Sequence, residues 1–190
     1  QEAIRDVRLM GFALDNLSQI VEVELAKKVR RAIKDSPLLE EAGSKSFGRD
    51  AQNELYITAI CCNAGMLVSL DEPDIVCRMN DQKWAIAAKR IKSLAQLEKR
   101  FCEAAKQIEK KGIPGIIALD MSVAFNPDNS DLPGNYSDQE MASAHSNSRK
   151  AFVDHYVNQM RAWSSGKGVC GLMILDHIVR YIPKTGVWGC

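Results

Sequence analysis

The chain has 190 residues, of which 46% are hydrophobic and 26% are charged, and this is enough apolar material for one sizeable core. We therefore predict a single domain over residues 1–190. Its 25 Lys and Arg residues and 24 Asp and Glu residues give a net charge of +1, which excludes a uniformly basic protein that binds polyanions over its whole surface. Any nucleic-acid site must then come from local charge segregation.

The start of the chain and the lengths of its apolar runs bear on where the protein is located. No apolar run approaches the roughly 18 residues that a membrane span needs, and the first residues lack the layout of a signal peptide. We therefore expect a cytoplasmic protein. Because the chain begins with Gln1, we also expect a fragment of a longer protein, with further domains or protein partners outside it.

The cysteines predict packing roles. None of them forms a C-x-x-C pair, zinc-ligand spacing is absent, and a core of this size does not need a disulfide framework. We predict buried thiols at all of these positions. They are Cys61, Cys62, Cys77, Cys102, Cys170 and Cys190.

Residues 1–45 are predicted to form a helical extension. Apolar residues recur every three or four positions from Ile4 to Ala32, which predicts one helix or two. A run of positive charges lies between Lys27 and Lys34. Such a run is typical of a solvated helix face, and otherwise of a contact with phosphate or with an acidic partner.

Residues 48–122 are predicted to form the core of the domain. A helix is expected from about residue 48 to 63, followed by three short strands at 66–70, 75–79 and 83–88 that form an antiparallel meander. Ser93 is predicted to cap a long amphipathic helix that ends near Lys111. The apolar run at 115–122 predicts an interior strand.

Residues 123–190 are predicted to add a loop, a helix and a terminal strand. The loop covers 125–134, the helix runs from Asp138 to about Met160, and the segment 168–182 supplies one last strand or a hairpin with the tail. The fold class is therefore α/β, with α and β elements in layers.

A carboxylate and a lysine are predicted to meet at one end of the sheet. Asp74 opens the second strand of the core, and Lys89 lies on the third. A tight hairpin between these strands places the two residues side by side. Metal-assisted phosphodiester hydrolysis uses such a pair, because carboxylate oxygens hold magnesium while a lysine orients or deprotonates the attacking water and offsets charge on phosphorus.

This stretch resembles the PD-(D/E)XK nuclease superfamily, which has the restriction-endonuclease-like fold. Pro73-Asp74 fits the PD, Lys89 fits the K, and Glu54 fits the acid often found on the first core helix. Gln107 falls where several branches carry a polar site residue. The αβββαβ order of residues 48–122 also agrees.

The resemblance implies a metal-dependent endonuclease that hydrolyses phosphodiester bonds of DNA with Mg²⁺ or Mn²⁺. It assigns catalytic roles to Asp74, Lys89, Glu54 and Gln107. Asp74 and Glu54 would hold the metal, with Glu72 as a further ligand. His145, His155 and His177 share no spacing, so a Ser–His or Cys–His nucleophile has little support.

The chain departs from the family pattern at one position. The superfamily places Asp or Glu two residues before the lysine, and here that residue is Ala87, which cannot bind metal. Three interpretations stay open: Glu54 or Glu72 completes the site, the alanine is an engineered knockout, or the domain is a natural nuclease relative that binds without cutting. The alternative function is therefore a non-catalytic module that recognises nucleic acid or a protein.

Charge segregation favours nucleic acid, in particular DNA, as the partner. Residues 83–111 hold nine Lys or Arg against three Glu, a net charge of +6, whereas residues 112–148 hold five acids and no Lys or Arg. We expect the helix after the lysine strand and the run from Lys27 to Lys34 to flank one groove for a phosphate backbone. The competing interpretation is a solvated amphipathic helix.

Overall fold

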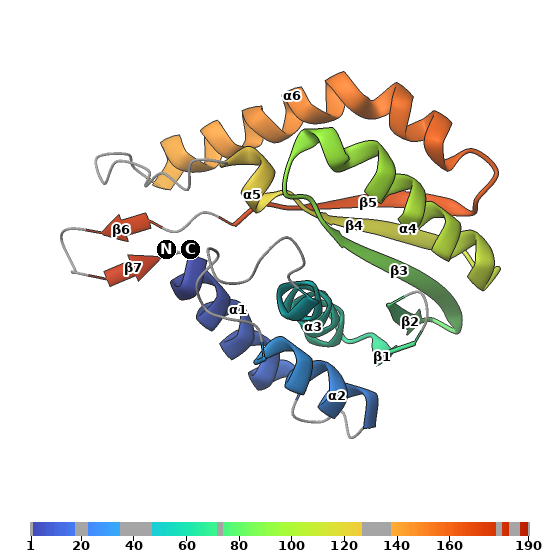
Figure 1. Cartoon of the computed structure of the whole chain (residues 1–190), viewed down its shortest axis with the longest axis horizontal. Helices are drawn as coiled ribbons and strands as arrows, with labels where there is room; N and C mark the ends of the chain where they lie inside the picture. Colours follow the sequence, from blue (N-terminus) through green and yellow to red (C-terminus); the bar gives the residue numbers. More distant parts are fainter. Residues whose placement is uncertain are drawn as a thin grey trace.

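A five-stranded mixed sheet with helices on both faces forms the centre of the protein (Figure 1). The computed structural model describes residues 2–17, 23–34, 47–71, 74–126, 138–177, 180–182 and 187–189. In chain order the elements are α1 (Glu2–Leu17), α2 (Val23–Ala32), α3 (Phe47–Asn63), β1 (Leu67–Ser69), β2 (Ile75–Met79), β3 (Gln82–Arg90), the short 3₁₀ helix η1 (Leu94–Gln96), α4 (Leu97–Lys111), β4 (Gly115–Asp120), α5 (Ser122–Phe125), α6 (Asp138–Ser164), β5 (Val169–Leu175), β6 (Arg180–Ile182) and β7 (Val187–Gly189).

The sheet combines an antiparallel half with a parallel half. Its strand order is β1-β2-β3-β4-β5, with β1, β2 and β3 antiparallel and β3, β4 and β5 parallel. Asn80 and Asp81 form the turn between β2 and β3 with positive φ angles, which Asn and Asp tolerate well. This turn fixes the register of β2 against β3, in which Ile75 pairs with Ile86.

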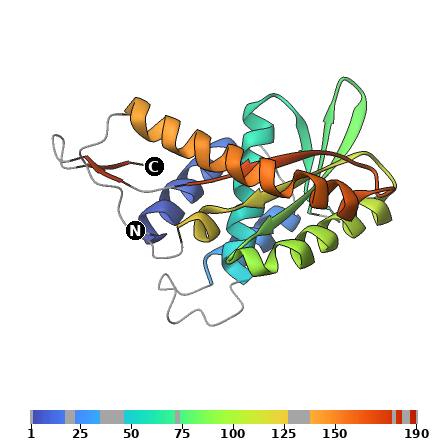
Figure 2. The same ribbon diagram turned by 90° about the horizontal axis from the view of Figure 1, so that it is seen from above.

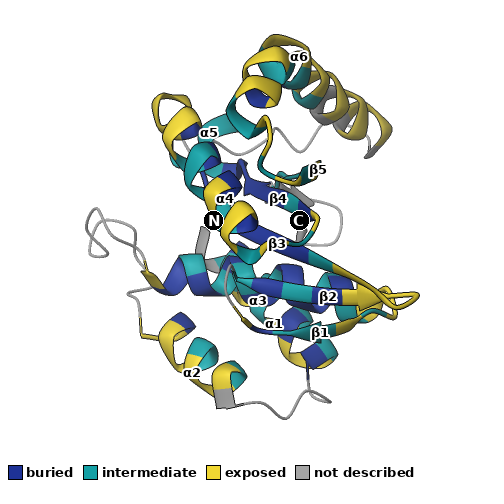
Figure 3. Ribbon diagram, turned by 90° about the vertical axis from the view of Figure 1, so that its right-hand side faces the viewer, coloured by how far each residue is buried: buried dark blue, intermediate teal, exposed yellow. Residues whose placement is uncertain are grey.

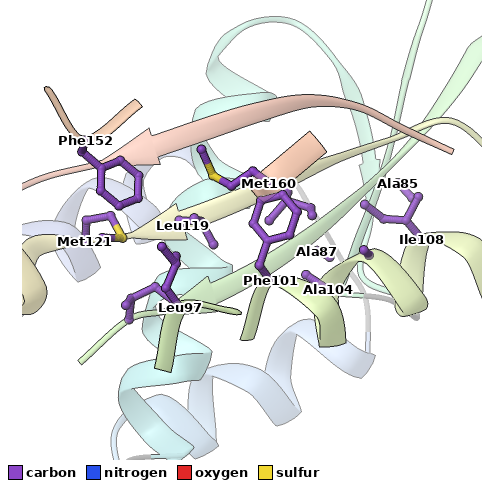
Figure 4. Close-up of a cluster of buried hydrophobic side chains, with 13 residues drawn as sticks. Ala85, Ala87, Leu97, Phe101, Ala104, Ile108, Leu119, Met121, Phe152 and Met160 are labelled. Carbon is purple, nitrogen blue, oxygen red and sulfur yellow. The ribbon is translucent and has the colours of Figure 1, made fainter. Parts of the chain in front are cut away.

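Alternating side chains give the sheet two different apolar faces. On one face, Ala85 and Ala87 of β3 join a cluster with residues of α4 and α6, such as Phe101 and Met160 (Figure 4). On the other face, the intervening β3 residues pack beneath α3. Both faces are therefore covered, as the parallel half of a sheet requires.

The N-terminal helices form a third layer beyond α3. Buried residues of α1 and α2, including Ala13 and Ala32, pack with Leu55 of α3 in a separate cluster. Figure 3 shows α1, α2 and α3 on one side of the strands and α4 and α6 on the other. Figure 2 shows α6 crossing the sheet, and the β6–β7 hairpin beyond the end of β5.

The predicted mixed α/β class and the αβββαβ element order are confirmed. The antiparallel meander and the interior strand are also as predicted, and the structure adds that this strand, β4, runs parallel to β3. The predicted cap was wrong, since Ser93 precedes η1 without a capping side-chain hydrogen bond. At the C-terminal end the structure has one long strand in the main sheet and a separate two-stranded hairpin.

The cysteine prediction is correct only in part. Cys61 and Cys77 are buried in the cluster beneath α3, and Cys62 and Cys102 are half-buried. Cys170 is exposed, because it lies on the outermost strand of the sheet, β5. Cys190 lies outside the described residues.

None of the helices in the described ranges combines the length and the apolar character needed to cross a membrane.

Candidate functional site

Asp74 lies at the start of β2 and is held there by β3. The backbone N–H of Ala88 donates a hydrogen bond to Asp74 Oδ2 over 2.9 Å, and Lys89 Nζ donates to the same oxygen over 3.3 Å. The β2 ladder begins one residue later, at Ile75, so the Asp74 side chain supplies an acceptor for β3 where the ladder ends. The predicted proximity of Asp74 and Lys89 is confirmed.

Burial makes the Asp74–Lys89 pair chemically unusual. The side chains are only 12% and 14% exposed, respectively. Burial raises the pKa of Asp74 to about 6, although the nearby Lys89 ammonium acts to lower it, and the Glu54 carboxylate raises it further. A carboxyl group with such a pKa near neutrality is typical of functional sites, and also occurs in structural ion-pair networks.

Glu54 reaches the same region from α3. Its carboxylate forms an ion pair with Lys28 of α2, and both side chains are less than one-fifth exposed. Lys28 Nζ also lies 3.5 Å from the main-chain oxygen of Asp74. Lys28 therefore links the two acids that the sequence predicted would converge.

A polar pocket of about 500 Å³ opens where α2, α3 and the β1–β2 connection meet. It is lined by Glu24, Lys28, Arg31, Ala51, Glu54, Leu70, Asp71 and Asp74. Lys89 is not one of the lining residues, but its ammonium group contacts the carboxylate of Asp74, which is. The pocket thus places two partly buried carboxylates, Glu54 and Asp74, on one concave surface.

The described residues offer a small donor set for a metal ion. They contain no group of three or more His, Cys, Asp or Glu side chains arranged for one. Glu72, the further ligand in the sequence prediction, lies outside the described residues. Glu54 and Asp74 nevertheless fit Mg²⁺ or Mn²⁺, because Mg²⁺ is usually held by one or two carboxylates and completes its shell with water and substrate phosphate oxygens. The Lys28 ammonium beside both residues shows that a cation is accommodated there.

Ala87 stands where the family pattern has an acid. Continuing the β2–β3 register by one residue beyond Ile75 places Asp74 across from Ala87. The Ala87 side chain is fully buried in the cluster with Phe101 and Ala104 (Figure 4). A carboxylate at this position would lie across from Asp74 in the strand register, but on the face that α4 covers, where it would displace apolar packing.

Gln107 lies on α4, which covers the opposite face of the sheet from α3. Its Oε1 atom is buried and has no hydrogen-bond partner in the described part of the chain. The structure therefore does not join Gln107 to Lys89 by a hydrogen bond through this oxygen, and its predicted role stays a prediction.

Lys28 is the residue that the sequence prediction missed. In the sequence it belongs to the basic run from Lys27 to Lys34, yet it shares the inner face of α2 with Leu25, Val29 and Ala32, at helical spacing. A charge on such an apolar stripe requires a partner. That conflict was visible in the sequence and could have identified Lys28.

The predicted shared groove between the two basic helices was wrong. α2 packs on α3, whereas α4 packs on the other face of the sheet together with α6 (Figure 3). The sequence pattern gives the charge on each helix but not the sheet face to which the helix belongs.

A second polar cluster lies at the carboxyl ends of β3, β4 and β5. Asp120 Oδ1 accepts hydrogen bonds from the backbone N–H and the hydroxyl of Ser122, and Arg90 lies 3.5 Å from its other oxygen. Burial lowers the pKa of His177, whose backbone N–H donates to the Ser122 hydroxyl. One ion pair and three hydrogen bonds therefore join the strand ends.

Comparisons with protein-family models, with curated proteins and with solved structures found no match for this chain.

Proposed function

We propose that this protein is a metal-dependent phosphodiester hydrolase acting on DNA, with a restriction-endonuclease-like core over residues 48–122. The observation that supports this most directly is the contact between Lys89 and Asp74 at the open end of the β2–β3 hairpin, with Glu54 in the adjoining pocket. The αβββαβ order with a mixed sheet is compatible with this core.

In this proposal each residue has a definite role. Glu54 and Asp74 hold Mg²⁺ or Mn²⁺ through their carboxylate oxygens. The bound cation supplies Lewis-acid stabilisation of the charge that develops on the phosphoryl oxygens. Lys89 has three N–H donors, so it can keep its contact with Asp74 while it orients a water molecule or offsets charge on phosphorus.

Ala87 favours a second candidate, a nuclease-like module that binds nucleic acid or protein without cutting. A third carboxylate across from Asp74 is missing, and losing one contribution to a metal site commonly lowers affinity or activity about 10- to 100-fold. We therefore expect weak cleavage, with Glu54 supplying the acid that position 87 lacks.

Cleavage of plasmid and oligonucleotide DNA in millimolar Mg²⁺ or Mn²⁺ tests the proposal. We expect slow, metal-dependent cleavage by the wild-type chain and loss of cleavage in Lys89→Met. Lys83→Met is the matched control, because Lys83 is an exposed lysine near the start of the same strand. Binding of duplex DNA without cleavage in the presence of either Mg²⁺ or Mn²⁺ would instead support the non-cutting binding module.

A further inference from the structure

Lys28 occupies an unusual position for a lysine on a surface helix. Its ammonium group lies between the Glu54 carboxylate and the main-chain oxygen of Asp74, and its side chain is 19% exposed. Both contacts are hard oxygen atoms of the kind that bind Mg²⁺ or Mn²⁺. A lysine ammonium and a divalent cation would therefore interact with the same carboxylate.

We propose that Lys28 is an internal competitor for the metal, which holds Glu54 in position and must move away from it before a divalent cation can bind there. This inference rests on the proposed function, because it assigns Glu54 to a metal site. Lys28 contacts oxygens of both Glu54 and Asp74, so a divalent cation held between these two residues would meet the Lys28 charge at close range and be repelled by it. Lys28 thereby sets the metal affinity of the pocket.

The position of α2 makes such a movement feasible. An apolar pocket of about 210 Å³ that is partly open to solvent lies between α1, α2 and α3, and its lining includes Leu14, Leu17, Leu25 and Val29. A helix that rests on incomplete packing can shift its side chains at lower cost than one in a filled core.

The polar wall of the candidate site also comes partly from α2. Glu24, Lys28 and Arg31 follow one another at helical spacing and line the 500 Å³ pocket together. A shift of α2 would therefore change the distance between Lys28 and Glu54 and the opening of the pocket at the same time. Metal binding and the position of α2 are coupled in this arrangement.

Titration of chelator-treated protein with Mn²⁺ alone tests this inference without relying on activity. Lys28→Met removes the ammonium group but keeps an unbranched chain on the inner face of α2. We expect it to bind Mn²⁺ about 10- to 100-fold more tightly than wild type, within the range found when groups around a metal site are changed. Lys27→Met is the matched control with wild-type affinity expected, because Lys27 is 64% exposed and pairs with Glu24.

A structural role for Lys28 gives different results. In that case Lys28→Met loses stability, and its Mn²⁺ affinity equals that of wild type or falls below it, which would overturn the inference while leaving the proposed function intact. If wild type and Lys28→Met both fail to bind Mn²⁺, the inference and the metal-dependent function fail together. Lys28→Gln gives the same comparison if the methionine variant does not fold, and adding Glu54→Gln to either variant should abolish the gain.

Discussion

At Asp74, fold stability and the proposed metal binding favour different forms of the side chain. The fold favours the protonated carboxyl group, whereas the metal ion binds the ionised carboxylate. Burial raises its pKa from the ordinary 3.8 to about 6, so the folded protein holds this proton more tightly than the unfolded chain does. The stabilising contribution of the protonated form is complete below pH 3.8 and is lost as the pH rises through 6. Ionised Asp74 therefore destabilises the fold at neutral pH by about 3 kcal/mol.

Asp74→Asn should accordingly stabilise the protein at pH 8 by up to about 3 kcal/mol and have little effect near pH 4. Asparagine keeps an oxygen that can accept the Ala88 N–H, but it carries no charge. Urea denaturation at both pH values measures the difference. Asp81→Asn is the control, because the Asp81 side chain is 92% exposed. A loss of stability at pH 8 would show that the ionised carboxylate is a net structural contributor.

Ala87→Glu tests whether a carboxylate at position 87, where the family pattern has an acid, contributes to metal binding. The new carboxylate would lie across from Asp74 in the strand register, so we expect Mn²⁺ affinity to rise about 10- to 100-fold. It would also enter the cluster around Phe101, and we expect the metal-free protein to lose about 1–3 kcal/mol of stability. Ala87→Gln separates the two effects, since it adds the same bulk without the charge. Unchanged Mn²⁺ affinity in Ala87→Glu would indicate that position 87 does not face the metal.

The buried oxygen of Gln107 gives a prediction about stability alone. An unsatisfied buried acceptor costs about 1–3 kcal/mol, so Gln107→Met should raise the free energy of unfolding by about 1 kcal/mol. Gln52→Met should lower it, because the Gln52 amide donates to the carbonyl of Ala32 over 3.0 Å. Thermal denaturation of the two variants side by side checks this contrast. Equal losses would mean that the Gln107 amide has a partner in solution.

At the scale of elements, the two basic helices should behave differently toward DNA. α2 contributes Arg31 to the pocket wall, whereas α4 lies on the other face of the sheet. On the proposed function, Arg31→Gln should reduce the slope of log affinity against log salt by about 0.9, the value for one phosphate contact on B-DNA. Changing Lys99, Arg100 and Lys106 together to Gln should leave that slope unaltered. Filter binding at several salt concentrations measures both slopes. A reduced slope in the α4 variant with an unaltered slope in Arg31→Gln would assign the phosphate surface to α4.

The sequence predicted the β2–β3 part of the site because a short hairpin has a nearly determined register. Asn80 and Asp81 are recognisable turn residues, and counting outward from them brings Asp74 level with Ala87, two residues before Lys89. The contacts of Lys28 could not be obtained in this way. They depend on how α2 packs against α3, and helical periodicity identifies an inner face without identifying its neighbour.

At the scale of the whole molecule, the candidate site lies where separate layers meet. The open end of the β2–β3 hairpin supplies Asp74 with Lys89, α3 supplies Glu54, and the N-terminal layer supplies Lys28. Helix α2, which belongs to the segment predicted as an extension to the core, therefore contributes directly to the pocket. Removing α2 would open the pocket and leave Glu54 without its cationic partner.

The most direct measurement of the central claim is the Mn²⁺ dissociation constant of wild type, Glu54→Gln, Asp74→Asn and the double variant. If the two carboxylates hold one ion, each single change should weaken binding about 10- to 100-fold, and the double change should cost less than the product of the two. Glu24→Gln is the control from the same pocket, since Glu24 is half-exposed and paired with Lys27. Wild-type affinity in both single variants, or no Mn²⁺ binding by the folded wild-type protein, would contradict the account.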